Sequence, residues 1–199
     1  MSRPTDPALL PARPRQWGAS LVELIMFIVV IGAGLAGILG VWRVTAQGSA
    51  DPLIQKQALA IAEAYLEEAL GAPFTYCDPD DANAATAQST GPVNPADPTV
   101  CAAVIEAVGA EAGETRGSGT TPFDNVNDYN GLSGAPTSID GTAIGGLSAY
   151  QVSVTVTQEA LSTVGSAQSL RVSVAVTGPA NTTVQLDGYR TRYAPNALP

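Results

Sequence analysis

The chain has 199 residues, of which 45% are hydrophobic and 14% charged, and its formal net charge is −9. This acidic excess disfavours binding to nucleic-acid phosphates, because the only basic group, Arg171, Arg190 and Arg192, is too small to offset it. The sequence contains no His, which excludes His-based catalysis and His metal ligands, and with no nucleophile–base set visible we expect no enzyme.

The run Leu21–Trp42 is apolar except for one charged residue, Glu23. As an α-helix, a run of this length extends about 33 Å, which is enough to cross the hydrocarbon core of a bilayer. Arg3, Arg13 and Arg15 precede it, which favours a cytoplasmic N-terminus and an exported C-terminal part. A lone acid in such a span is unfavourable by about 2.5–3.5 kcal/mol at the bilayer centre and by less near its edge. Glu23 is therefore expected to have a partner.

Three interpretations of the N-terminus compete. A secretory signal peptide explains the basic start, but its apolar core is shorter and is cleaved at its far end. A plain transmembrane anchor explains the length of the run but not an acid near its beginning. The third interpretation places a cleavage site before the run, between Gly18 and Ala19, so that Glu23 becomes the fifth residue of the mature chain.

The segment Gly18-Ala19-Ser20-Leu21-Val22-Glu23 resembles the processing motif of type IV prepilins. The resemblance implies a basic leader over residues 1–18, cleavage after Gly18 by prepilin peptidase and methylation of the new N-terminal amine of Ala19. It also implies an assembly role for Glu23, which would lie near the N-terminal amine of a neighbouring subunit and set axial register. Most family members have Phe at the position of Ala19, and major pilins often have Pro where this chain has Gly40, which indicates a minor subunit.

Small residues at 48–50, followed by Asp51 and Pro52, predict a break or kink in the helix, with Asp51 as N-cap and Pro52 in the first turn. We therefore expect a hydrophobic transmembrane or filament-core helix over residues 19–47 and an amphipathic helix over residues 48–73. Gly71 and Pro73 mark its end. The apolar stripe predicts packing on a sheet, and it is formed by Ile54, Ala58, Ile61, Tyr65, Leu59, Leu66 and Leu70.

Residues 74–199 are predicted to form the exported globular domain, with an irregular region over 74–148 and antiparallel strands over 149–193. Apolar and polar residues alternate from Tyr150 to Thr157 and again from Leu170 to Thr177. A third strand runs to Tyr193, and its alternation shifts at Asp187-Gly188, which predicts a bulge. The pattern gives an α+β fold; that a long helix lies on the sheet as in pilins follows from the resemblance.

The segment 123–131 combines aromatic residues with turn-forming polar ones. Asp124, Asn127 and Asp128, with Asn125 beside them, offer the hard oxygen ligands that calcium prefers. A second acidic segment, 78–81, offers the same chemistry. Neither spacing matches an EF-hand loop, and Asp and Asn are also common in turns for local reasons, so both explanations remain open. No other cofactor is expected.

Cys77 and Cys101 both lie in the part that is expected to be exported. An even pair in an oxidising compartment predicts one disulfide. Closing the intervening loop would stabilise the folded domain by about 3–4 kcal/mol. The alternative is a pair of buried free thiols.

Residues 57–68, Pro73-Phe74 and the segment 123–131 further resemble MshD-type minor pilins of the mannose-sensitive haemagglutinin pilus. This implies a subunit that enters a pilus, or primes its assembly, for attachment or surface motility. Its partners would be prepilin peptidase/methyltransferase, other pilin subunits and the inner-membrane assembly platform. The implied location is a single-pass inner-membrane protein with a periplasmic domain, and then the pilus. A minor pseudopilin of a type II secretion system and a membrane-anchored extracellular binding module remain as alternatives.

Overall fold

The computed structural model describes residue 18 and residues 20–198, without the side chains of 43–51. It divides into two compact units, Met1–Gly48 and Ser49–Pro199. Helix α1, Leu21–Gly71, contributes its first part to one unit and its last part to the other. The expectation for Ala19 and for the basic leader before Gly18 lies outside the described residues.

In the first unit, the run Leu21–Trp42 is helical and exposed along its whole length. Its length and composition are those of a helix that can cross a membrane, as a single span or a signal anchor. A methyl group added at Gly32, Gly34, Gly37 or Gly40 would meet no other atom within 4 Å. The glycines thus leave open space on the helix surface.

Helix α1 continues through Pro52, so of the predicted break or kink at 48–52 the break is wrong. A Pro inside a helix removes one backbone hydrogen bond, and its ring crowds the carbonyl four residues earlier, here that of Gly48. The segment that follows is rich in Ala, Leu, Gln and Glu, which favour helix, and its apolar stripe is buried. These gains outweigh the loss of one hydrogen bond, and the helix ends at Gly71 as predicted.

The second unit contains a four-stranded antiparallel sheet in the order β1-β2-β3-β4, with β1 Ser133–Gly134, β2 Gln151–Gln158, β3 Ser169–Thr177 and β4 Thr183–Thr191. Strands β2, β3 and β4 confirm the three predicted strands. Strand β1 was not predicted, because two residues are too few to show alternation. Among the described residues there are also three short 3₁₀ helices: η1 Val126–Tyr129, η2 Ser166–Gln168 and η3 Pro179–Asn181.

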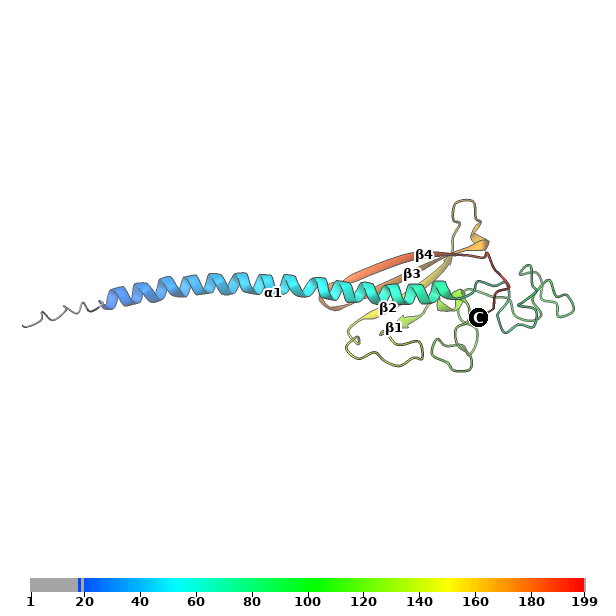
Figure 1. Cartoon of the computed structure of the whole chain (residues 1–199), viewed down its shortest axis with the longest axis horizontal. Coiled ribbons are helices and arrows are strands. Elements are labelled where there is room, and N and C mark those ends of the chain that lie inside the picture. The colour runs from blue at the N-terminus through cyan, green and yellow to red at the C-terminus, as the bar shows by residue number, and fades with distance from the viewer. Residues whose placement is uncertain (1–17, 19, 199) are drawn as a thin grey trace, which may run out of the picture. The chain divides into compact units, whose positions relative to one another are not determined.

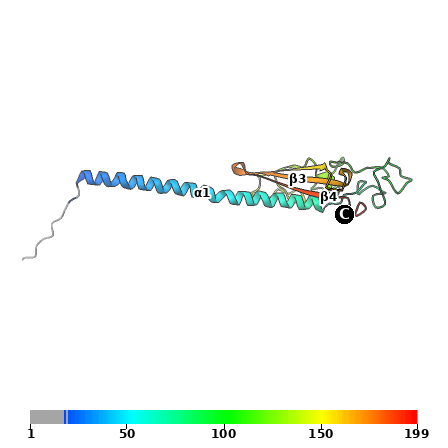
Figure 2. The same ribbon diagram turned by 90° about the horizontal axis from the view of Figure 1, so that it is seen from above.

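Within this unit, the last part of α1 lies along one face of the sheet (Figures 1 and 2). The core is formed by the predicted helix stripe and the inward residues of the strands, together with Val126 and Tyr129 of η1. Leu59 is the exception, since it is 37% exposed at the edge of the stripe. The alternating Val residues of β2 and β3 are buried, whereas the Ser and Thr residues between them on β2 face solvent.

The bulge predicted at Asp187-Gly188 is absent from the sheet. The β3–β4 pairing runs without a shift, with Ser173 opposite Asp187 and Val172 opposite Gly188. Gly188 occupies an inward position, and a Cβ built there would lie 2.6 Å from Cδ1 of Leu70 and 3.3 Å from Cδ1 of Leu66. The alternation fails in the sequence because leucines of α1 fill the space where a strand side chain would lie.

Replacing Gly188 by Val is therefore expected to lower the free energy of unfolding by about 1–3 kcal/mol, the usual effect of overpacking a core. Asp187→Val is the matched control, because it places the same side chain on the exposed face of the same strand and should change stability by less than about 0.5 kcal/mol. Denaturant unfolding of both variants, followed by circular dichroism, measures the difference. Equal stability of the two variants would show that α1 does not pack tightly over Gly188.

A buried ion pair joins α1 to two loops. Arg116 donates from Nε to Oε1 of Glu68 at 2.7 Å and from Nη2 to Oε2 at 2.6 Å, and the two side chains are only 8% and 18% exposed. The Arg116 guanidinium also lies 4.5 Å from the ring centroid of Tyr65 and donates to the Thr137 carbonyl oxygen at 3.2 Å. The Tyr129 hydroxyl donates to Oε1 of Glu68 at 3.0 Å. This cluster holds the loops against the helix.

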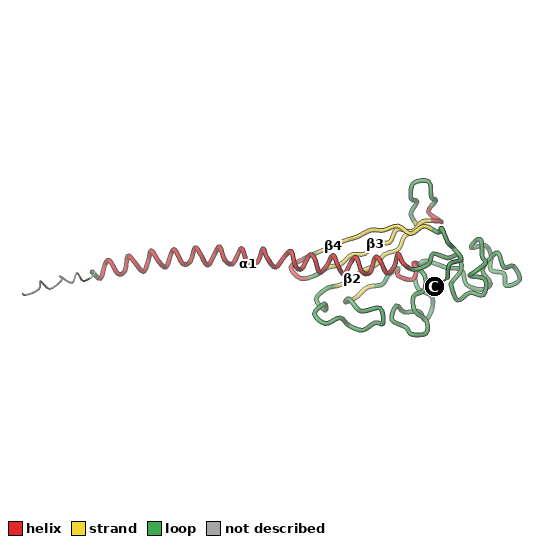
Figure 3. The backbone as a smooth tube through the Cα atoms, viewed as in Figure 1, coloured by secondary structure: helices red, strands yellow, loops and turns green. Residues whose placement is uncertain are grey.

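Most of the segment from the end of α1 to the start of β2 is loop (Figure 3), as predicted for 74–148. Cys77 and Cys101 form the predicted disulfide, with their Cα atoms 5.4 Å apart. Both are fully buried with Ala84 and Ala87 in a small second core. The disulfide thus anchors a loop that has few apolar residues of its own.

Candidate functional site

The N-terminal motif lies at the start of α1. Gly18 and Glu23 are exposed, and Glu23 is in the first turn of the helix. The backbone N–H of Glu23 donates to Oγ of Ser20 at 3.2 Å, so Ser20 acts as the N-cap. Sequence reasoning did not assign this role, although Ser followed three residues later by Glu is a helix-start signal. An acid in the first turn also interacts favourably with the helix dipole.

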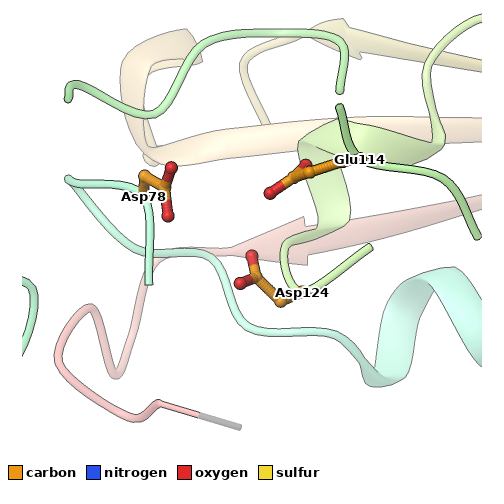
Figure 4. A group of neighbouring side chains, drawn as sticks. All are labelled: Asp78, Glu114 and Asp124. Carbon is orange, nitrogen blue, oxygen red and sulfur yellow. The ribbon is translucent and has the colours of Figure 1, made fainter. Parts of the chain in front are cut away.

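A second candidate site is a cluster of six acidic side chains in two groups. Oxygens of Asp78, Glu114 and Asp124 lie within 4.8 Å of one another, and Figure 4 shows these three carboxylates, from three separate segments, pointing toward a common space. The second group has the same spacing and consists of Glu106, Glu111 and Asp128. We refer to the six together as the carboxylate cluster.

Backbone contacts on two sides position the cluster. Glu106 donates its N–H to the carbonyl oxygen of Tyr76 at 3.1 Å, next to the bridge between Cys77 and Ile105. On the other side, Gly109 donates its N–H to the carbonyl oxygen of Asn127 at 3.0 Å. The disulfide-anchored segment and η1 therefore hold the acidic loop 106–114 between them.

Asp128 is fixed by its own turn. Its Oδ2 accepts hydrogen bonds from the backbone N–H groups of Asp124 at 3.0 Å and Asn125 at 2.7 Å. Its Oδ1 is buried and accepts no hydrogen bond. Oδ2 thus orients the side chain, and Asp128 also lies against the carboxyl of Glu111, whose pKa is raised by burial and by Asp128.

Several other oxygens in this region are also buried without a hydrogen bond. They are both carboxylate oxygens of Glu106 and Oδ1 of Asn127, and the two residues are 6% and 2% exposed. Leaving a buried polar group unsatisfied costs about 1–3 kcal/mol, and more when it is charged. Among the described residues, the ion pairs are Glu68–Arg116 and Glu159–Arg171, so no acid of the cluster has a cationic partner.

Burial and mutual repulsion make these carboxyls reluctant to ionise. Burial, followed by the charges of Asp128 and Glu111, raises the pKa of Glu106 to about 9, although the neighbouring Asn127 amide offsets this in part. Burial and the charges of Glu114 and Asp78 raise the pKa of Asp124 to about 7. Burial is also the main cause that raises the pKa of Glu114 to about 7 and that of Asp128 to about 6.

These shifts have a defined sign for stability. A carboxyl whose pKa is higher in the folded state binds its proton more tightly there than in the unfolded chain. For Glu106 the folded state therefore loses stability as the pH rises from 4.5 to about 9, unless another positive charge replaces the proton. A bound cation is the ordinary replacement.

The structure brings the predicted oxygen ligands only partly together. Asp124 and Asp128 fall into different groups of the cluster, and Asn127 lies beside Glu106. In the second predicted segment, Asp78 joins the cluster, whereas Asp81 does not. Both carboxylate oxygens of Asp81 accept backbone N–H groups, from Asn83 and Ala102 through Oδ1 and from Ala103 and Val104 through Oδ2. Asp81 therefore has a structural role.

Sequence reasoning missed Glu106, Glu111 and Glu114. They stand apart in the chain with no polar motif around them, and only the fold brings them to the 124–128 segment. One signal was available, since residues 57–115 contain many acids and no Lys or Arg. Because the segment contains no basic residue, any positive charge that pairs with its acids must come from outside the segment.

Comparison with known proteins adds no relative to this description. No protein-family model matches the chain, and neither a curated protein nor a solved structure matches it.

Proposed function

We propose that this chain is a minor type IV pilin, a structural subunit that is processed by prepilin peptidase and enters a filament through α1. The observation that carries the proposal is the position of Glu23, the only charged residue in the run Leu21–Trp42 and the fifth residue after Gly18. An α+β domain in which the end of a long helix packs on an antiparallel sheet is compatible with such a subunit.

Glu23 would act in the filament by pairing with a neighbour's N-terminal amine. In a bundle of apolar helices both charges are desolvated, and their attraction is stronger there than in water. Because desolvation opposes this gain, the pair fixes the axial register of the subunits more than it adds net stability. The exposed glycines between Gly32 and Gly40 leave room for close approach of neighbouring helices.

Mass spectrometry of the mature N-terminal peptide tests this proposal. Cleavage after Gly18 with a methylated Ala19 supports it, whereas an intact Met1 or a cut after the apolar run contradicts it. A membrane-anchored extracellular binding module is expected to give one of the latter two results.

The same observation also supports a second candidate, a minor pseudopilin of a type II secretion system, because the processing motif is shared. The neighbouring genes distinguish the two. A retraction ATPase and pilus genes beside this one favour the pilin, and a secretin with secretion genes favours the pseudopilin. The MshD-like assignment and a role in attachment or surface motility apply to the first case.

A further inference from the structure

The carboxylate cluster gathers six carboxyl groups with no cation paired to them among the described residues, and it lies in the globular unit, remote in sequence from the N-terminal motif. We propose that Glu106, Glu111 and Asp128 bind one Ca²⁺ ion. The neighbouring group of Asp78, Glu114 and Asp124 adds negative charge around this site. The proposal does not depend on assembly into a filament.

The spacing of the oxygens fits the ion. Calcium binds oxygen at about 2.3–2.6 Å, so two ligands on opposite sides of it are separated by up to about 5 Å. Each of the three side chains offers a carboxylate oxygen that lies within 4.8 Å of the other two. This separation is of the size found between ligands of one calcium ion.

The unpartnered oxygens point to a ligand independently of this spacing. Both oxygens of Glu106 and Oδ1 of Asp128 are buried without a hydrogen bond of ordinary geometry, and these residues are 6% and 1% exposed. The Asn127 side-chain amide, which lowers the pKa of Glu106, is a polar group near it that favours the charged form, and it carries no charge itself. A cation would satisfy groups that are otherwise costly to bury.

The donor set favours calcium over other metal ions. The protein contains no His, and both of its cysteines are in the disulfide, so soft and borderline metals lack their preferred ligands. Calcium accepts six to eight oxygens in irregular geometry, including bidentate carboxylates such as Glu106 can provide. Magnesium requires near-ideal octahedral geometry, which ligands from a loop and a 3₁₀ helix do not supply as readily.

A pocket reaches one edge of the proposed site, at Glu106. It has a volume of about 340 Å³, and Glu106, Asn127 and Arg192 are among its lining residues. Arg192 lines the same pocket, and its charge and that of Glu106 attract each other. The guanidinium lies over the rings of Phe74, at 3.8 Å, and Tyr76, at 4.6 Å, and makes no ion pair among the described residues, so it offsets the charge of Glu106 only in part.

Calcium would join two parts of the domain. Glu106 and Glu111 belong to the acidic loop that follows the disulfide, whereas Asp128 belongs to η1, whose Val126 and Tyr129 are in the main core. Occupation of the site would fix the loop to the core, so the expected effect of the ion is on thermal stability.

The test compares the melting temperature of the full-length, disulfide-bonded chain in detergent with EDTA, with about 10 mM CaCl₂ and with the same concentration of MgCl₂. That calcium concentration exceeds the dissociation constants of about 10⁻⁴–10⁻³ M found for extracellular calcium modules. Calcium is expected to raise the melting temperature by about 5–10 °C, and magnesium by less than half as much. No rise with calcium, or an equal rise with magnesium, overturns the proposal.

Variants locate the site. Two substitutions, Glu106→Gln and Glu111→Gln, should each raise the calcium dissociation constant at least about tenfold in a calorimetric titration. In EDTA, Glu106→Gln should melt no lower than the wild type, because Gln replaces a carboxyl whose charged form burial and the neighbouring acids disfavour, and this result separates a ligand from a structural group. Glu63→Gln removes an exposed carboxylate on α1 and should keep the full calcium shift. Full calcium binding by both cluster variants contradicts the assignment.

Discussion

Replacing Glu23 by Ala is expected to reduce incorporation of the chain into filaments by more than about a hundredfold. In the proposed filament the change leaves a neighbour's N-terminal amine buried without its partner. Removing one member of a buried ion pair costs about 3–5 kcal/mol, and each 1.4 kcal/mol is about a factor of ten in an equilibrium constant. Counting filaments, and blotting sheared filaments for this subunit, measures the effect.

The structure makes Glu23→Ala a specific change. The hydrogen bond that caps α1 uses the backbone N–H of residue 23, which Ala retains, so the start of the helix is expected to persist. Membrane insertion should also be unaffected or improved, since a charge is removed from an apolar span. Glu63→Ala, an exposed acid farther along α1, is the matched control and should leave filaments normal. Normal incorporation of the Glu23 variant would exclude the assembly role.

Replacing Arg116 by Ala is expected to lower the free energy of unfolding by about 3–5 kcal/mol. The change leaves the Glu68 carboxylate, only 18% exposed, without its cation. It also removes the donor to the Thr137 carbonyl oxygen and the stacking on Tyr65. Denaturant unfolding of the full-length chain in detergent, followed by circular dichroism, measures the loss.

A double variant separates the ion pair from the packing around it. Glu68→Leu combined with Arg116→Met replaces the pair by apolar side chains, and such replacements of buried pairs are often close to neutral. The double variant should therefore be more stable than Arg116→Ala alone. If Arg116→Ala lost less than about 1 kcal/mol, the pair would behave as an exposed surface ion pair, and the loops would be held to α1 by other contacts.

The sequence predicted the elements whose pattern is local. The apolar run Leu21–Trp42, the helix stripe from Ile54 to Tyr65 and the alternating Val residues of β2 and β3 each reveal one buried or apolar face. The disulfide was also predictable, because the chain has only two cysteines. These features required no knowledge of which segments meet in space.

Other features depend on contacts between distant segments, and sequence patterns do not record them. Gly188 breaks the alternation of β4 because leucines of α1 fill the space that a side chain at this position would need. In the sequence this break resembles a bulge, although the strand pairing has no shift. Pro52 has the appearance of a helix start, but packing of the following stripe keeps α1 continuous. The candidate metal ligands were predicted only in part, since Glu106 and Glu111 reach Asp128 through the fold alone.

Processing of this chain as a prepilin is tested most directly by the mass of its mature N-terminal peptide, isolated from cells that contain prepilin peptidase. We expect this peptide to begin at Ala19 and to carry one methyl group on its amine. The same chain from cells that lack the peptidase should retain residues 1–18. A peptide that still begins at Met1 in the presence of the peptidase, or one that begins beyond Trp42, would show that the chain is not processed as a prepilin.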